Sequence, residues 1–115
     1  MITNIYLTRH GETELNIKKV YFGWTDVPLT LQGQAQCKVV NESLNGIAFD
    51  AIITSPLIRT MQSSEIITGL NKNSFEIYPE LKELNFGKWE NLHYTEIEKL
   101  YNDEWLEWAK DWQGF

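Results

Sequence analysis

The sequence predicts an α/β fold in which a mostly parallel sheet carries helices on both faces. Three segments have the length and composition of strands: a short apolar run at residues 5–7, residues 49–54 with an apolar centre at 51–53, and the alternating segment 75–78. Between them lie segments whose apolar residues recur every three or four positions, which is the period of a helix. Strands that alternate with helices are typical of parallel sheets, and such sheets bind ligands at the carboxyl ends of their strands.

The first predicted strand, residues 5–7, is followed by Thr8 and then by Arg9, His10 and Gly11. A cation beside an imidazole is costly to bury unless an anion is present. We therefore expect both side chains at the mouth of the sheet, where they can meet an anionic ligand. Gly11 would let the backbone approach that ligand or turn where a Cβ would clash. The alternative is an ordinary strand end with a surface histidine.

Two helices are predicted between the strands. Thr30 is a good N-cap for a helix over residues 31–44, which the Asn45-Gly46 pair would end. The second helix would begin near Pro56, because a missing N–H costs little in the first turn, and end at Gly69 or Asn71. The predicted apolar faces consist of Leu31, Ala35, Val39, Val40 and Leu44 in the first helix and Ile58, Met61, Ile66 and Leu70 in the second.

Composition limits the size of the protein and its possible partners. A chain of 115 residues is at most one domain. Its net charge of −6 argues against nucleic acid or an anionic membrane as a partner, and no basic cluster stands out. The single cysteine, Cys37, excludes an internal disulfide and is expected as a small core residue in a reducing compartment. Neither a signal peptide nor an apolar run of membrane-spanning length is recognised, so we expect a cytoplasmic protein.

Residues 9–13 carry the strongest functional signal. The pentapeptide Arg-His-Gly-Glu-Thr is expected by chance in a chain of this length in about 1 case in 10,000 or fewer. It resembles the signature of the histidine phosphatase superfamily, the phosphoglycerate-mutase-like proteins. The resemblance implies that His10 is the nucleophile that becomes phosphorylated and that Arg9 binds the phosphate. Asn16 matches an asparagine that often contacts the same phosphate in that family.

Residues 55–59 match a second motif of the family, Ser-Pro-Leu-x-Arg, whose arginine is the second phosphate ligand. Arg59 is therefore expected in the first turn of the second helix. A helix N-terminus at the carboxyl end of a strand attracts anions, and a guanidinium adds a planar, bidentate donor. The alternative for Arg59 is a solvated helix charge. Residues 26–33 also resemble a family segment, and we expect their role to be structural.

Residues 83–90 resemble the loop that supplies the general acid of the family, which would be Glu83. A protonated glutamic acid at that place could give its proton to a departing alkoxide. Two neighbouring carboxylates, Glu80 and Glu90, are expected to be structural or surface residues. Without the resemblance, so many carboxylates in so short a stretch would indicate a solvated loop.

The C-terminal part of the chain, residues 94–115, has apolar and aromatic residues at spacings of three and four. It predicts one or two amphipathic helices carrying Trp105, Trp108 and Trp112. Three tryptophans in so short a segment could form a platform for a sugar or a base. Packing in a core or a lid is the interpretation we favour, because large aromatic side chains dominate core energetics.

The resemblance covers the whole chain but only part of the family pattern. Family members are longer and have a second catalytic histidine near the end of a later strand. His93, the other histidine of this sequence, follows the acid loop too early and opens a predicted helix. The chain therefore resembles the first three-fifths of such an enzyme, as a single partial domain over residues 1–115.

The resemblance implies phosphomonoester hydrolysis through a phosphohistidine, of the α-ribazole phosphatase or broad-specificity type, on a small phosphorylated substrate. It implies neither cofactor nor metal, because arginines neutralise the phosphate. A phosphoglycerate mutase is the second hypothesis, although the acidic, aromatic segment after residue 95 lacks the basic insertion typical of mutases. The third is a catalytically incompetent fragment that binds phosphate or self-associates. Self-association is expected because an open strand edge and the aromatic tail would expose apolar surface.

Overall fold

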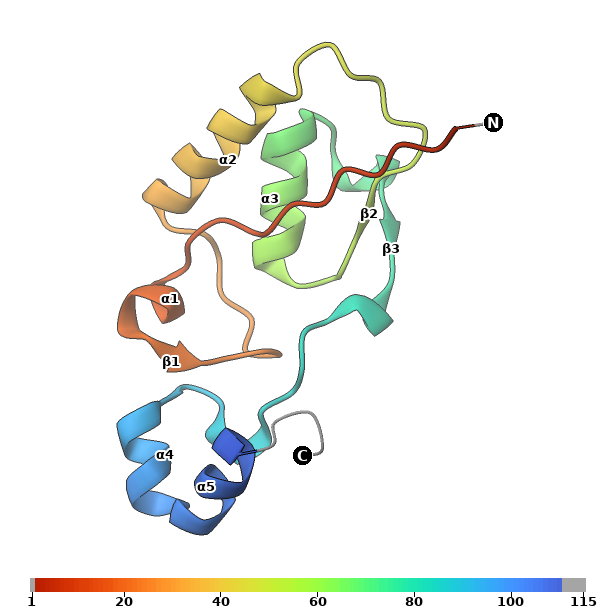
Figure 1. The fold of residues 1–115 in the computed structure, drawn as a ribbon. Helices are drawn as coiled ribbons and strands as arrows, with labels where there is room; N and C mark the ends of the chain where they lie inside the picture. Colours follow the sequence, from red (N-terminus) through yellow and green to blue (C-terminus); the bar gives the residue numbers. More distant parts are fainter. Residues whose placement is uncertain (1, 111–115) are drawn as a thin grey trace. The chain divides into compact units, whose positions relative to one another are not determined.

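The computed structural model describes residues 2–110, which form an α/β fold divided between two compact units (Figure 1). The first unit comprises Met1–Glu14 and Asp26–Lys82, and the second comprises Leu15–Thr25 and Glu83–Phe115. Trp112, one of the three tryptophans expected on the C-terminal helices, lies outside the described residues. No helix within residues 2–110 combines the length and the apolar character needed to cross a membrane.

Two helices, α2 (Leu31–Ser43) and α3 (Ile58–Thr68), pack against each other in the first unit (Figure 1). The predicted N-cap is confirmed, since the Thr30 side chain accepts a hydrogen bond from the backbone N–H of Gly33. Gly69 ends α3 with a left-handed φ of 74°, as its sequence position predicted. The predicted start of α3 was two residues early, because Pro56 lies outside the helix.

The apolar faces predicted for these helices were partly wrong. Leu31 and Val39 of α2 are 83% and 62% exposed, whereas Cys37 is buried as expected. In α3 the buried stripe is Arg59, Ser63 and Ile67, spaced by four residues. Apolar periodicity cannot reveal this stripe, because two of its three members are polar. The core of the unit consists of Leu29, Cys37 and Ile67, with Val40, Leu44 and Ile66 packed against it.

The parallel pairing expected from the sequence is confirmed for one pair of strands. β2 (Ile53–Thr54) pairs in parallel with β3 (Glu76–Ile77), with Ile53 opposite Glu76 and Thr54 opposite Ile77. Both strands are shorter than predicted, and Ile53 is 56% exposed. Single turns of 3-10 helix, η1 (Lys72–Ser74) and η2 (Pro79–Leu81), flank β3.

The first predicted strand was wrong as a buried strand. Residues 2–10 have no strand assignment, and Ile5 and Leu7 are 81% and 85% exposed. A strand needs a neighbour for its backbone groups, and no segment within residues 2–110 pairs with this one. Among these residues the predicted, mostly parallel sheet is therefore one parallel pair and, in the second unit, one antiparallel pair.

The second unit combines a short antiparallel pair with helices. β1 (Val20–Tyr21) pairs with β4 (Leu92–His93), and Leu15 of α1 (Glu14–Lys18) is buried. The rest of the unit is formed by η3 (Gly87–Trp89), α4 (Tyr94–Leu100) and α5 (Asn102–Lys110). Near the C-terminus one or two helices were expected, and the structure has two. Ile97 of α4 and Trp89 of η3 are the most deeply buried side chains of this unit, at 0% and 4% exposed.

Candidate active site

The loop that contains His10 is tied to helix α3 by one serine. The backbone N–H of Gly11 donates to Ser63 Oγ at 3.0 Å, and Ser63 Oγ donates to the carbonyl of Arg59 at 2.7 Å. Ser63 lies one helical turn after Arg59, so a single hydroxyl joins the backbone beside His10 to the turn that carries Arg59. Through Ser63, hydrogen bonds therefore connect the chain beside His10 with the helical turn of Arg59, and both residues belong to the first unit.

The imidazole of His10 is oriented by its own neighbour. His10 Nδ1 lies 2.6 Å from the carbonyl oxygen of Gly11. A carbonyl oxygen can only accept, so Nδ1 must carry the proton in this contact. In the neutral ring the lone pair is then on Nε2. This tautomer gives His10 a nucleophilic nitrogen whose position is set by the backbone.

Two glycines allow the loop to lie directly on the start of α2. A Cβ at Gly11 would collide with the carbonyl of Gly33, and a Cβ at Gly33 would collide with the backbone of Glu12. The carbonyl of Glu12 accepts from the backbone N–H of Thr30 at 2.9 Å, and Thr30 Oγ1 donates to the carboxylate of Glu12 at 2.9 Å. Backbone therefore packs on backbone here, which explains the glycines on both sides of the contact.

Arg59 is the second residue of α3 and is only 1% exposed. The first residue of the helix, Ile58, donates its backbone N–H to the carboxylate of Asp26 at 2.7 Å. Asp26 thereby satisfies a donor that the helix itself cannot satisfy, and its charge suits the positive end of the helix. The burial of Arg59 excludes the alternative of a solvated helix charge. Arg9, in contrast, is exposed.

Asn16 and Glu83, the other predicted site residues, belong to the second unit. Asn16 lies in α1, where its carbonyl accepts from the N–H of Lys19 at 3.1 Å. Glu83 is exposed, and its carbonyl accepts from the indole N–H of Trp24 at 2.8 Å. A Cβ at Gly23 would collide with the carbonyl of Leu84, so this loop also uses a glycine for a close backbone approach.

Glu90 has a structural role in the second unit, as expected for one of the carboxylates near Glu83. Its carboxylate accepts hydrogen bonds from three consecutive backbone N–H groups, those of Gly23 at 2.9 and 3.0 Å, Trp24 at 2.6 Å and Thr25 at 3.3 Å. Consecutive N–H groups that converge in this way form a concave anion site. In this chain the anion is a side chain of the protein itself.

His93 caps a helix. Its ring nitrogen Nδ1 accepts from the backbone N–H of Thr95 at 3.2 Å, while the backbone N–H of His93 donates to the carboxylate of Glu96 at 3.0 Å. These reciprocal bonds form a capping box at the start of α4. The sequence-based expectation that His93 opens a helix is confirmed.

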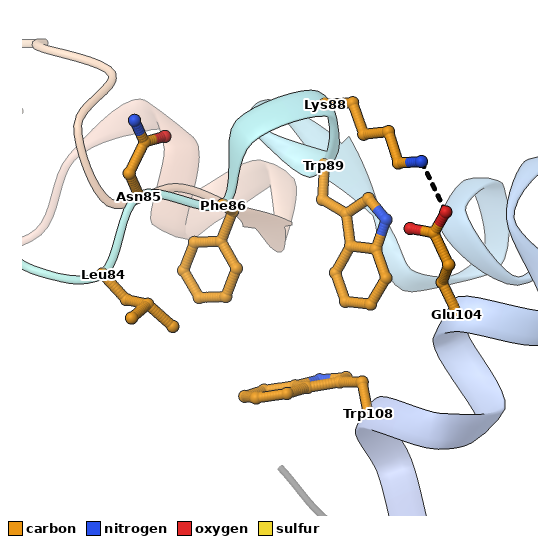
Figure 2. A pocket seen from close by; sticks show the side chains of 7 residues that line it. All are labelled: Leu84, Asn85, Phe86, Lys88, Trp89, Glu104 and Trp108. Carbon is orange, nitrogen blue, oxygen red and sulfur yellow. Dashed lines mark hydrogen bonds and ion pairs between the residues drawn. The ribbon is translucent and has the colours of Figure 1, made fainter. Parts of the chain in front are cut away.

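The aromatic residues near the C-terminus pack together around Trp89, as Figure 2 shows for one side of the cluster. The ring centroids of Trp105 and Trp108 lie 6.1 and 6.3 Å from that of Trp89. A small pocket of about 230 Å³ beside them is edged by an ion pair between Lys88 and Glu104 at 2.5 Å. Packing within the unit, rather than an open platform, accounts for these tryptophans.

One residue that positions the site, Ser63, was missed at the sequence level. The structural roles of Asp26 and Glu90 agree with the sequence-based expectation, since both carboxylates accept hydrogen bonds from backbone N–H groups. Ser63 had a weak signal, because it lies four residues after Arg59 and hence on the same helix face. Within residues 2–110 no group of three or more His, Cys, Asp and Glu side chains could hold a metal ion.

Comparison with known proteins places this arrangement in a family. Residues 5–115 match the model of the histidine phosphatase superfamily (branch 1). The Adenosylcobalamin/alpha-ribazole phosphatase of Escherichia coli K12 is 33% identical over 109 residues, which are 95% of this chain and 54% of that protein. The "Probable phosphoglycerate mutase GpmB" of Proteus mirabilis is 40% identical over 100 residues, which are 87% of this chain and 45% of that protein.

Solved structures agree with these matches. The alpha-ribazole phosphatase from Shigella flexneri superposes with a TM-score of 0.81 at 30% identity, covering 90% of this chain and 52% of that one. YhfR of Bacillus stearothermophilus superposes with a TM-score of 0.74 at 32% identity, covering 85% and 48%. The chain spans about half the length of the curated relatives it matches.

Proposed function

Because the chain belongs to the histidine phosphatase superfamily, branch 1, we propose that its function is hydrolysis of small phosphomonoesters through a phosphohistidine on His10. The observation that carries the proposal is the hydrogen-bonded link from Gly11 through Ser63 to the carbonyl of Arg59. It joins a candidate nucleophile to the turn that carries a buried guanidinium. Nucleophilic attack on a phosphate dianion needs both, since the charge must be neutralised before an imidazole can approach.

In the proposed reaction Nε2 of His10 attacks phosphorus, and the bond from phosphorus to the ester oxygen breaks. The proton on Nδ1 stays bonded to the carbonyl of Gly11, which keeps Nε2 as the attacking atom. Arg9, Arg59 and Asn16 are proposed to bind the non-bridging phosphate oxygens, and Glu83 to protonate the departing oxygen. Water then attacks phosphorus, the bond from phosphorus to Nε2 of His10 breaks, and inorganic phosphate leaves.

The names of the relatives suggest the substrate class. Adenosylcobalamin/alpha-ribazole phosphatases are among the relatives, so we include a phosphorylated nucleoside-like ester among the candidate substrates. We also propose a cytoplasmic location, which the single buried Cys37 supports because a free thiol suits a reducing compartment.

Trapping the phosphorylated protein tests the nucleophile. The protein, mixed briefly with labelled phosphomonoester and quenched in alkali, is expected to carry acid-labile phosphate. His10→Ala should abolish this label, whereas the matched variant His93→Ala should keep it, because His93 only caps α4. A label that survives in His10→Ala, or that disappears only in His93→Ala, would rule out His10 as the nucleophile.

Leaving-group dependence tests Glu83. Glu83→Gln should slow hydrolysis of alkyl phosphates far more than that of p-nitrophenyl phosphate, because p-nitrophenolate departs without a proton. Glu80→Gln is the matched control, since Glu80 is an exposed carboxylate of the same stretch of chain. Equal losses on both substrates in Glu83→Gln would mean that Glu83 does not donate the proton.

A phosphoglycerate mutase is the second candidate, favoured by the 40% identity to the relative from Proteus mirabilis. Turnover of 3-phosphoglycerate that depends on a bisphosphoglycerate primer would support it over the phosphatase. The third candidate is a chain that binds phosphate or self-associates without turnover. Absence of phosphoprotein and of phosphate release, with phosphate binding retained, would support that one.

A further inference from the structure

Glu83, the proposed general acid, lies in a stretch of irregular backbone. Residues 83–86 belong to no helix or strand, and Glu83 is exposed. A glutamate side chain has high rotational freedom, and irregular surface segments are more mobile than helices and strands. The position of the Glu83 carboxyl group therefore depends on the contacts that fix the backbone at this residue.

The indole of Trp24 makes such a contact. Its N–H donates to the carbonyl of Glu83 at 2.8 Å. The preceding residue, Gly23, lies so close to Leu84 that a Cβ would collide with the carbonyl of Leu84. Trp24 is 48% exposed, against 4% for Trp89, so core packing does not account for its position. The directional contact of the Trp24 side chain is the bond to the acid segment.

Trp24 is itself held by Glu90. The carboxylate of Glu90 accepts from the backbone N–H of Trp24 at 2.6 Å and also from the N–H groups of the residues on either side. Hydrogen bonds to a charged acceptor are shorter and stronger than neutral ones. The loop over residues 83–90 is thus bound to residues 23–25 at both of its ends, and both segments belong to the second unit. This double attachment restricts the positions that Glu83 can take.

We propose that Trp24 is the positioning residue of the general acid: its indole N–H fixes the backbone of Glu83 and thereby the reach of the carboxyl group. The inference rests on the proposed function, in which Glu83 protonates the departing oxygen. A proton donor acts within hydrogen-bond distance of that oxygen, and misplacement by about 1 Å can cost on the order of 100-fold in rate. Trp24 acts through Glu83 and not on the substrate.

Leaving-group dependence in Trp24→Phe tests this role. Phenylalanine keeps an aromatic ring but has no N–H to donate. Turnover of alkyl phosphates should fall about 10-fold, whereas that of p-nitrophenyl phosphate should change by less than about 2-fold, because its phenolate departs without a proton. The ratio of the two rates is the diagnostic quantity.

Trp105→Phe is the matched control, because it makes the same chemical change elsewhere in the second unit. The ring of Trp105 packs against those of Tyr21, Trp89 and Tyr94, none of which lies in residues 83–86. Trp105→Phe should therefore change the two rates by the same factor, even where it lowers stability. A proportional loss on both esters in Trp24→Phe would overturn the proposal, because it would indicate a merely structural role.

Amide ¹⁵N relaxation gives a readout that does not require turnover. The amide of Leu84 shares a peptide plane with the carbonyl of Glu83. Its order parameter should be about 0.8 or higher in the unmodified chain and in Trp105→Phe, and should fall to about 0.6 in Trp24→Phe. An order parameter that Trp24→Phe leaves unchanged would overturn the positioning role. An unmodified chain that hydrolyses none of these esters would instead contradict the proposed hydrolysis, and the order parameter would still decide whether Trp24 fixes Glu83.

Discussion

The two compact units are stabilised by different kinds of contact. In the first, which contains His10 and Arg59, the loop over residues 11–13 is fixed by glycine-to-backbone packing and by bonds from Ser63 and Thr30. In the second, Trp89 lies among other aromatic rings, including Trp105 at 6.1 Å. The first unit uses directional contacts to position a loop, whereas the second uses the buried area of large side chains.

The difference has a functional consequence. A loop that carries a nucleophile must be held in one geometry, because misplacement by 1 Å can be costly to the reaction rate. Hydrogen bonds and backbone contacts impose such a geometry, while packing of rings tolerates small shifts. The contacts around Gly11 are therefore expected to be sensitive to small substitutions, and those of the second unit to loss of volume.

The largest effect on stability is expected from removing a buried side chain of the second unit. Ile97→Ala should lower the free energy of unfolding by about 2–5 kcal/mol, because Ile97 is fully buried and a cavity would remain. Leu100→Ala in the same helix should change it by less than about 0.5 kcal/mol, since Leu100 is 63% exposed. Chemical denaturation measures both, and similar losses would show that packing at Ile97 does not stabilise the unit.

The next effect sharpens the comparison in the first unit. Gly33→Ala should lower the unfolding free energy by about 1–3 kcal/mol, because the new methyl group would collide with the backbone of Glu12. In an ordinary helix the same change is stabilising by about 1 kcal/mol, so the sign itself is diagnostic. Gln32→Ala, at an exposed position of the same turn, is the control. A gain in thermal stability for Gly33→Ala would contradict the close backbone packing.

A smaller loss is expected where the second unit does use directional bonds. Glu90→Gln should lower the unfolding free energy by about 1–2 kcal/mol, because charge-assisted bonds from the N–H groups of residues 23–25 become neutral ones. Glu98→Gln, an exposed carboxylate on α4, should be nearly neutral. Thermal unfolding of the two variants side by side provides the measurement. Indistinguishable melting temperatures would show that the negative charge of Glu90 adds little to the strength of its hydrogen bonds with the three N–H groups.

The smallest effect concerns one phenol of the first unit. The hydrogen bond from Tyr78 to Glu76, at 3.0 Å, and the charge of that carboxylate raise the pKa of Tyr78 above its ordinary value. The stability contributed by this contact is fully present below the unfolded pKa of tyrosine and is lost as the pH rises through the higher folded pKa. Ultraviolet titration should show the pKa of Tyr78 decreasing in Glu76→Gln. An unchanged titration curve would show that Glu76 is not the cause.

Several helix ends, which depend on only a few neighbouring residues, were predicted correctly from the sequence. Thr30 caps α2, Gly69 ends α3 in a left-handed conformation, and His93 opens α4. Each depends on backbone geometry within one helical turn, so the neighbouring residues suffice to predict it. The motifs around His10 and Arg59 belong to the same class of information, because the family is identified from short runs of residues.

The sequence by itself determined the family, the helices and the candidate nucleophile, and the tertiary structure decided which surfaces are buried and what holds the loops. Gly11 and Ser63 are 52 residues apart, and Gly23 and Glu90 are 67 residues apart. Neither bond has a local signature, because each depends on where distant segments meet. The apolar run at residues 5–7 shows the same limit in reverse: its composition predicts a buried strand, but burial requires a neighbouring strand, and no segment within residues 2–110 supplies one.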